Sequence, residues 1–340
     1  MKLNQRILFI ILLLALPIFV ATTSYSEAKQ TSQKTQSKTL SKSSKAKKST
    51  AKKAPVKQAD RFSALVVDAN TGHILYEKNA GATRYPASLT KMMTLYLTFE
   101  ALKTGKLDIT DTLPVSAKAA RQPQTNISLD AGDRLPVKTA IESLVVRSAN
   151  DSSMVLAEAL GGTEWNFALM MNKKARELGM KGTVFRNPNG LPNSQQVTTA
   201  YDMARIGIAL RRDFPQYYPY FKLTEFTHNG ITYPGHNRVM GRYSGVDGIK
   251  TGFINASGFN LVTSVKKNGY SLVAVIMGGS SGAARDNAMI DLLDKTFAGL
   301  ASKQKNLAQN QFGNQTFAPQ AVEPSAGGSE AVTTANAAVQ

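Results

Sequence analysis

Strand patterns at both ends of the chain, with helical patterns between them, most constrain its fold. Residues 63–78, SALVVDANTGHILYEK, predict two strands joined by a turn at Asn70-Thr71-Gly72. Residues 259–277 predict a second hairpin, because two apolar runs flank Lys267-Asn268-Gly269. Helical periodicity marks residues 88–106, 135–150, 151–160, 163–180, 199–210 and 284–300. This order predicts an α/β sheet domain that carries a helical insertion.

The N-terminus has the pattern of an export signal. Lys2 and Arg6 precede an apolar run at residues 7–20, and small residues follow it. This pattern predicts a secretory signal over residues 1–28, cleaved after Ala28, and hence a periplasmic, envelope or extracellular protein. A permanent anchor is the alternative, but the run of 14 residues contains Pro17 and falls short of the roughly 20 that span a bilayer.

Two segments of biased composition are expected to flank the folded domain. Residues 29–60 carry ten lysines and a single acid, Asp60, among many Ser and Thr residues. They cannot bury enough apolar surface to fold, so a disordered linker is predicted there. Residues 302–340 are rich in Gln, Asn, Ala, Ser and Gly, and predict a disordered tail without a membrane anchor. The folded domain is therefore assigned to residues 61–301.

The formal charge of +18 does not indicate a nucleic-acid partner. Residues 29–60 supply half of it, and nucleic acid is not expected where an exported protein works. We interpret this segment as a solvated linker. Electrostatic contact with an anionic envelope surface is the functional alternative.

Metal and thiol chemistry are not expected. The chain has no cysteine, which excludes disulfides and thiolate nucleophiles. Its three histidines, His73, His228 and His236, do not stand at ligand spacing. We interpret them as surface or structural residues and predict neither a metal nor a cofactor.

A Ser-His-Asp hydrolase is also disfavoured. The stretch GGSSG at residues 278–282 follows a predicted strand and precedes a helix, as a nucleophile elbow does. In that architecture the histidine follows the serine, and no histidine follows His236. Ser280 therefore has no base, and we interpret the stretch as a turn.

Ser88 and Lys91 are a candidate nucleophile and base. They stand three residues apart at the start of a predicted helix, and so share one face of it. A buried lysine beside another cation could take the proton of the serine hydroxyl. The spacing alone is weak evidence, because it recurs at Ser26/Lys29, Ser44/Lys47, Ser49/Lys52, Ser264/Lys267 and Ser302/Lys305.

Two further motifs follow Ser88 in order. Ser148-Ala149-Asn150 lies in a predicted turn between helices, and Lys250-Thr251-Gly252 lies on a predicted strand. An earlier Lys-Thr-Gly, residues 103–105, stands where a helix is expected to end, with Gly105 as its cap. That first copy needs no catalytic explanation.

Residues from about Arg61 to Phe297 resemble low-molecular-mass penicillin-binding proteins of the serine-type D-alanyl-D-alanine carboxypeptidase class. The three ordered motifs are typical of penicillin-binding proteins and class A β-lactamases. RYPASLTKMMT, SANDSS, FRNPNGL, TTAYDMARI and GVDGIKTGFINASGFNLV are similar to the carboxypeptidases. The resemblance implies an α/β fold of the α+β type. Its mainly antiparallel sheet is flanked by helices and carries an inserted all-helical subdomain, as in β-lactamases and transpeptidases.

The resemblance also implies a role for each matching residue. Ser88 is the nucleophile and Lys91 its general base, while Ser148 relays a proton to the leaving amine. Asn150 orients the substrate and holds the lysine. Lys250, Thr251 and Gly252 bind the substrate, and the backbone N–H groups of Ser88 and Phe253 form the oxyanion hole. The implied reaction removes the terminal D-alanine of peptidoglycan stem peptides, and β-lactams act as covalent inhibitors.

Two departures from the family accompany these expectations. Phe253 stands where many relatives have histidine, and the tail lacks the β-rich domain and amphipathic helix that many of them carry. A DD-endopeptidase that cuts peptide crosslinks shares the chemistry and remains an alternative. A β-lactamase is less favoured, because TVFRNPNGL holds no acid to activate water. A non-catalytic wall-binding protein is a further alternative.

Overall fold

A five-stranded antiparallel sheet organises residues 61–312, the part of the chain that the computed structural model describes. Its strand order is β2-β1-β9-β8-β7. The strands are β1 (Ser63–Asp68), β2 (Ile74–Lys78), β7 (Val246–Ile254), β8 (Gly258–Lys267) and β9 (Tyr270–Gly279). Both predicted hairpins are confirmed. The first strand pairs with the last, and β7 is left at one edge of the sheet.

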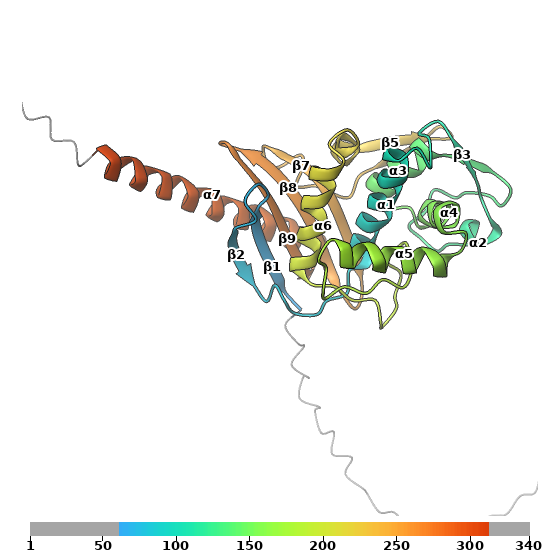
Figure 1. Cartoon of the computed structure of the whole chain (residues 1–340), viewed down its shortest axis with the longest axis horizontal. Coiled ribbons are helices and arrows are strands. Elements are labelled where there is room, and N and C mark those ends of the chain that lie inside the picture. Colours follow the sequence, from blue (N-terminus) through green and yellow to red (C-terminus); the bar gives the residue numbers. More distant parts are fainter. Residues whose placement is uncertain (1–60, 313–340) are drawn as a thin grey trace, which may run out of the picture. The chain divides into compact units, whose positions relative to one another are not determined.

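The sheet is covered on both faces. Leu65, Val273 and Val275 belong to a core shared with α6 (Ala200–Asp213), whereas Val66 and Ala274 belong to a core shared with α7 (Gly282–Phe312). This follows from the alternation of side chains along a strand. Figure 1 shows α6 and α7 on opposite sides of the sheet. Because both faces are buried at the centre of the sheet, β1 and β9 are largely apolar runs.

The helices between β2 and α6 form the other half of the domain (Figure 1). They are the 3₁₀ helix η1 (Ala87–Thr90), α1 (Lys91–Lys103), α2 (Ala117–Ala120), α3 (Val137–Val146), α4 (Asn150–Gly161) and α5 (Glu164–Glu177). Helix α1 is buried along nearly its whole length. The four helices predicted in this half, and the α/β class with a mainly antiparallel sheet, are confirmed.

We had expected the inserted subdomain to be all-helical, but it also contains two short strands. A two-stranded sheet of β3 (Thr112–Pro114) and β4 (Arg134–Pro136) pairs Leu113 with Leu135, and both leucines are buried. Each strand has only three residues and ends in proline. A segment this short shows no recognisable alternation, which is why the sequence pattern did not reveal it.

A third hairpin follows the 3₁₀ helix η2 (Tyr218–Lys222) and was also missed. It consists of β5 (Glu225–His228) and β6 (Ile231–Pro234), joined by Asn229-Gly230. Phe226 stacks on Tyr233 with ring centroids 5.1 Å apart. The Asn-Gly pair is a hairpin signal that could have revealed it.

Helix α7 extends beyond the predicted domain boundary at residue 301, and continues to Phe312. Residues 301–306 are exposed, so this part of the helix packs against no core. The segment after Leu300 is polar but contains no Gly or Pro before Phe312, and Lys, Gln and Ala favour helix. The predicted disordered tail therefore began too early.

The predicted signal and linker lie outside the described residues, as does the tail after Phe312. Within residues 61–312, no helix is both long and apolar enough to cross a bilayer.

Candidate active site

Ser88 lies in η1, at the entrance to α1. The preceding residue, Ala87, has φ 48°, a left-handed conformation that is unusual for a residue other than glycine. Gly190 lies directly against this turn: a Cβ on Gly190 would lie 1.9 Å from the carbonyl oxygen of Ala87. The backbone around the serine is therefore held in one uncommon conformation by a close contact with another loop.

Lys91 is fully buried and contacts three groups of the site. Its Nζ lies 3.3 Å from Ser88 Oγ, 2.7 Å from Asn150 Oδ1 and 2.6 Å from the carbonyl oxygen of Asn189. A neutral amine has two N–H donors and one lone pair. The two oxygen acceptors take both donors, so the lone pair is left for the hydroxyl proton of Ser88.

The surroundings favour this neutral state. Burial holds the pKa of Lys91 well below its usual range, and the charge of Lys250 lowers it further, whereas Asp151 opposes the shift. Asp151 is itself buried, and its Oδ2 accepts hydrogen bonds from the backbone N–H groups of Ile127 and Leu129. A lysine with a lowered pKa can accept a proton near neutral pH.

Ser148 and Asn150 reach the site from the turn between α3 and α4. Ser148 has φ 63°, and its carbonyl oxygen accepts a hydrogen bond from Thr125 Oγ1 at 2.8 Å. The Ser148 hydroxyl is buried and has no hydrogen-bond partner among the described residues. Asn150 is the first residue of α4, and its side chain bridges Lys91 Nζ and the Pro123 carbonyl oxygen. The turn thus brings the Ser148 hydroxyl and the Asn150 side chain to the same cleft.

The second Lys-Thr-Gly lies on β7, as predicted. Lys250 is only 2% exposed, and burial together with the nearby Arg285 lowers its pKa to about 7. Lys250 therefore lies beneath the site, whereas Thr251 and Gly252 line it. A Cβ on Gly252 would lie 3.0 Å from the Ser88 nitrogen. Glycine is favoured here because η1 packs closely against the strand, and a Cβ would crowd its backbone.

These residues border one cleft of about 930 Å³. Ser88, Ser148, Asn150, Thr251, Gly252 and Phe253 all line it. Phe253 is 48% exposed and stacks on Phe259 with ring centroids 4.2 Å apart. The fold thus brings every predicted site residue to the cleft or, for Lys91 and Lys250, directly beneath it.

The loop between α5 and α6, residues 178–199, supplies a contact that the sequence did not predict. We call it the Asn189 loop. The carbonyl oxygen of Pro188 accepts hydrogen bonds from Thr94 at 2.6 Å and from Ser153 at 2.7 Å. These contacts hold the loop against α1 and α4, and so hold the Asn189 carbonyl on Lys91 Nζ.

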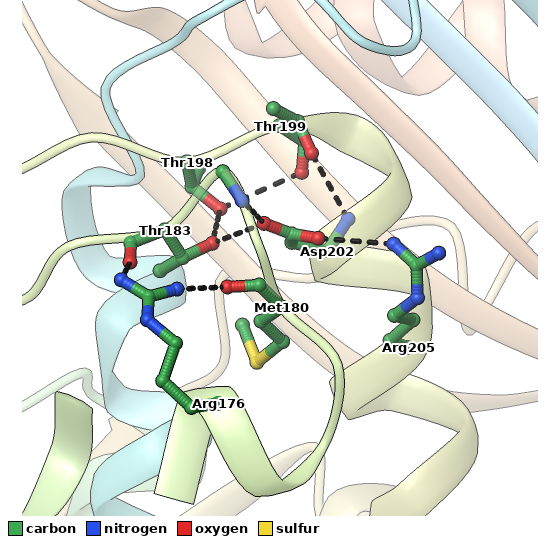
Figure 2. Close-up of polar contacts among 8 residues, drawn as sticks. Arg176, Met180, Thr183, Thr198, Thr199, Asp202 and Arg205 are labelled. Carbon is green, nitrogen blue, oxygen red and sulfur yellow. Dashed lines mark hydrogen bonds and ion pairs between the residues drawn. The ribbon is translucent and has the colours of Figure 1, made fainter. Parts of the chain in front are cut away.

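Asp202 fixes both ends of this loop (Figure 2). It is 2% exposed, and its Oδ2 accepts hydrogen bonds from the Gly182 N–H at 2.8 Å and from Thr183 Oγ1 at 2.7 Å. Thr183 in turn contacts Thr198 Oγ1 at 2.9 Å. Figure 2 also shows Arg205 on the other carboxylate oxygen, at 3.0 Å.

Replacing Asp202 by alanine is expected to destabilise the fold by about 2–4 kcal/mol, because it leaves buried donors unpaired. The Asn189 loop should loosen, and the rate of serine acylation should fall with it. Chemical denaturation and an acylation assay would measure both effects. Arg205→Ala is the control: its side chain is 48% exposed, so the loss should stay below about 1 kcal/mol. Equal losses in the two variants would contradict this assignment.

The competing sequence motifs have structural roles. Lys103, Thr104 and Gly105 end α1, and Gly105 has φ 70°, as expected for a residue that terminates a helix. Ser280 lies in an exposed turn between β9 and α7, and Ser281 Oγ accepts a hydrogen bond from the Ala284 N–H. Both interpretations are confirmed.

Several cleft residues were not singled out from the sequence. His236 lines the cleft and is exposed; the sequence predicted a surface or structural residue but not its position at the cleft. The arginines that line it come from three different segments of the chain: Arg147, Arg238, Arg242 and Arg285. Asn189 contacts Lys91 through its backbone carbonyl. Every residue has this group, so the residue type could not indicate the contact.

The comparison with known families decides the assignment. The family model described as D-alanyl-D-alanine carboxypeptidase, peptidase S11, matches residues 47–281. The chain belongs to this family. The predicted resemblance to low-molecular-mass penicillin-binding proteins is thereby confirmed.

Known S11 peptidases match most of the described chain. DacF of Bacillus subtilis, a D-alanyl-D-alanine carboxypeptidase, is 35% identical over 247 residues, 69% of this chain and 62% of DacF. DacA of Escherichia coli, with the same description, is 38% identical over 238 residues, 68% of this chain and 59% of DacA. The chain thus matches about three fifths of the length of these curated relatives.

A solved structure supports the S11 fold. Penicillin-binding protein 5 of Haemophilus influenzae has a TM-score of 0.68 and 36% identity, and the match covers 69% of this chain and 70% of that one. The described chain therefore shares the overall fold of that structure.

Proposed function

We propose that the protein is a serine-type D-alanyl-D-alanine carboxypeptidase that removes the terminal D-alanine of peptidoglycan stem peptides through an acyl-enzyme on Ser88. The observation that carries this proposal is the contact of buried Lys91 with Ser88, Asn150 and Asn189. A lysine held neutral beside a serine hydroxyl is the arrangement that activates such a nucleophile.

In the first step, Lys91 takes the hydroxyl proton as Ser88 Oγ attacks the carbonyl carbon of the penultimate D-alanine. The backbone N–H groups of Ser88 and Phe253 are the proposed oxyanion donors, and each donor of this kind is worth about 100- to 1,000-fold in rate. Gly252 lets β7 approach the Ser88 nitrogen closely. The N–H groups of Ser88 and Phe253 can bind one oxyanion only if η1 and β7 lie this close together.

In the second step, the C–N bond breaks and the leaving amine takes a proton. Ser148 is the proposed relay, because its buried hydroxyl has no partner among the described residues. Water then hydrolyses the ester, which returns Ser88 to its free form. Asn150 holds Lys91 and borders the substrate, while Thr251 and the charge of Lys250 attract the terminal carboxylate.

A β-lactam would acylate Ser88 in the same way and leave slowly. The Asn189 loop bears on this point: its cleft-lining residues are Asn189, Gly190, Leu191 and Pro192, none of them acidic. A class A β-lactamase uses a glutamate to activate the deacylating water. The geometry therefore favours a penicillin-binding enzyme over a β-lactamase.

The test is release of D-alanine from a monomeric pentapeptide muropeptide by the full chain, followed by mass spectrometry. We expect the wild type to remove a single alanine and Ser88→Ala to remove none. Both proteins should unfold at the same temperature, which separates loss of chemistry from loss of fold. A wild type that is as inactive as Ser88→Ala would contradict the proposal and favour a non-catalytic wall-binding role.

The pH dependence of kcat/KM should show whether the charge of Lys250 binds the substrate carboxylate. With a pKa of about 7, Lys250 is charged below that pH and neutral above it, so its attraction for a carboxylate is lost as pH rises. We expect kcat/KM for the pentapeptide to decline above pH 7, by up to about tenfold per pH unit. Lys250→Gln should remove this decline and lower kcat/KM at pH 6. A decline that persists in Lys250→Gln would exclude this group.

Export through residues 1–28 remains part of the proposal. In that setting the lysine-rich residues 29–60 would hold the enzyme near anionic envelope polymers. Removal of residues 29–60 should weaken sedimentation with isolated cell walls at low salt, and should leave acylation by a β-lactam unchanged.

A further inference from the structure

A second cavity, of about 960 Å³, is bordered by α6, η2, the start of β7 and the β8–β9 hairpin. None of the described residues lines both this cavity and the catalytic cleft. Along β7, Asp247 of the cavity lies four residues before Thr251 of the cleft, a distance of about 13 Å. The cavity is therefore a separate site, and the proposed function gives it no role.

Positive charge dominates this cavity. Asp247 is the one acid among the described residues that line it. The cations that line it are Arg211, Arg212, Lys222, Lys266 and Lys267.

Two of these five cations already have partners. Arg212 donates two hydrogen bonds to the carboxylate of Asp213, at 2.6 Å and 3.0 Å. Lys267 Nζ lies 4.7 Å from the centroid of the Tyr243 ring and 5.6 Å from that of Phe297. Both rings belong to the core shared with α7, on the other face of the sheet. Three cations therefore remain for a ligand in the cavity.

Arg211 is held beside Asp247 without a hydrogen bond between them. Its guanidinium carbon lies 5.2 Å from the centroid of the Tyr218 ring, and its Nη1 lies 3.7 Å from Asp247 Oδ1. Asp247 Oδ1 already accepts hydrogen bonds from the hydroxyls of Ser264 and Tyr218. Arg211 Nη1 is buried and has no hydrogen-bond partner in the described part of the chain. Such a donor is unusual in a native fold, and a bound anion would supply its partner.

Lys266 extends from the same face of the sheet. Ser264, two residues earlier on β8, contacts Asp247 on this face. Side chains two residues apart on a strand point the same way and lie about 7 Å apart. Lys266 also pairs with Ser271, which lines the cavity. The sheet therefore places Lys266 on the side where Arg211 lies.

Lys222 approaches the same acid from η2. It follows Phe221, which packs on the residue after Asp247: a Cβ on Gly248 would lie 2.9 Å from Phe221 Cβ. Lys222 and Lys266 are both exposed, and within residues 61–312 no carboxylate lies within 4 Å of either amine. Three cations from three elements thus surround one acid, which leaves an excess of two positive charges.

We propose that Arg211, Lys222 and Lys266 form a binding site for a phosphate monoester, separate from the catalytic cleft. A phosphate monoester carries nearly two negative charges at neutral pH and three strong acceptor oxygens, whereas a carboxylate carries one charge. A guanidinium binds two phosphate oxygens in one plane, and an ammonium attracts phosphate as a point charge.

The size of the cavity indicates that the phosphate is part of a larger molecule. Its volume of about 960 Å³ lies at the upper end of the range of about 300–1,000 Å³ found for small-molecule sites. An organic group attached to the phosphate would contact the apolar part of the lining. That part includes Ile208, Pro215 and Pro219.

The test measures binding of glycerol 3-phosphate to the full chain by isothermal titration calorimetry at constant ionic strength. We expect this ester to bind at least about tenfold more tightly than acetate, because it has a second charge and a third acceptor oxygen. Lys222→Gln and Lys266→Gln should each weaken its binding by about threefold or more, and Arg211→Gln by about tenfold or more.

Lys181→Gln is the matched control. Lys181 is exposed, as Lys222 and Lys266 are, but it lines neither cavity, so its variant should bind the ester as the wild type does. The lysines of residues 29–60 are present in every variant, and any anion that they bind is a constant background. Both exposed-lysine variants should unfold at the wild-type temperature, even if Arg211→Gln does not.

An unchanged affinity in Lys222→Gln and Lys266→Gln, an equal fall in Lys181→Gln, or acetate that binds as tightly as the ester would each overturn the inference. Phosphatidylcholine vesicles that contain phosphatidic acid distinguish two sources of the phosphate. Weaker sedimentation of the two variants with these vesicles would assign the site to a lipid headgroup, and sedimentation equal to that of the wild type would assign it to a soluble ester. None of these measurements involves Ser88, so their result is independent of the proposed function.

Discussion

Replacing Lys91 by methionine is expected to slow acylation of Ser88 by a β-lactam about a thousandfold. Methionine fills a similar volume but cannot accept the hydroxyl proton. The fold should survive, because the change removes a buried amine whose charged form is costly in this position. Asn150 Oδ1 and the Asn189 carbonyl lose one donor each, so a modest loss of stability is expected.

Stopped-flow acylation with a fluorescent penicillin, together with thermal unfolding, would check this expectation. Lys174→Met is the matched control. Lys174 is also largely shielded and paired, with Glu100 at 2.7 Å and Glu177 at 2.5 Å, but it lies on α5 outside the cleft. Its variant should acylate at the wild-type rate. If Lys91→Met acylated within about tenfold of the wild type, another group would have to be the base.

The rate should also depend on pH through Lys91. Because burial and Lys250 lower its pKa, a large fraction of the amine is neutral under conditions where an exposed lysine would be charged. Acylation should decline as pH falls through this lowered value, since the protonated amine has no lone pair for the proton of Ser88. The rate should thus fall at low pH because Lys91 is protonated, and at high pH because Lys250 loses its charge. For carboxylate-bearing substrates, a plot of rate against pH should therefore be bell-shaped.

The sequence predicted which side chains carry the chemistry of the site, but it did not predict the backbone contacts that hold them in place. Ser88, Lys91, Ser148, Asn150 and Lys250 stand in short motifs, where residue type and spacing are themselves the signal. Asn189 binds Lys91 through a carbonyl that any residue possesses. No residue pattern could have revealed this contact, because only the three-dimensional path of the loop creates it.

The sheet and the cleft-lining arginines show the same difference between what the sequence predicts and what only the fold reveals. Long apolar strands and an Asn-Gly turn predicted β8 and β9 correctly, because both faces of the sheet are buried. In contrast, Arg147 and Arg238 belong to different elements far apart in the chain, and each alone looks like a solvated charge. Both line the cleft only because the fold brings their segments to it.

Gly190→Ala is expected to be among the most damaging small substitutions in the domain. Gly190 has φ 88°, and an alanine Cβ would lie 1.9 Å from the Ala87 carbonyl oxygen and 2.9 Å from the Ser88 nitrogen. The clash is with backbone, so no side chain can rotate away from it. We expect the free energy of unfolding to fall by about 3 kcal/mol or more.

Any relaxation of this clash must displace η1, and with it Ser88, from Lys91 and from β7. Acylation should then fall about a hundredfold in the protein that remains folded, since an error of about 1 Å in a nucleophile has that effect. Gly162→Ala separates the causes: Gly162 has φ 72°, but its Cβ would meet nothing within 4 Å. That variant should lose only about 1 kcal/mol and keep its acylation rate. If the two variants behaved alike in denaturation and acylation, backbone strain alone would explain Gly190, and the Asn189 loop would not position the nucleophile.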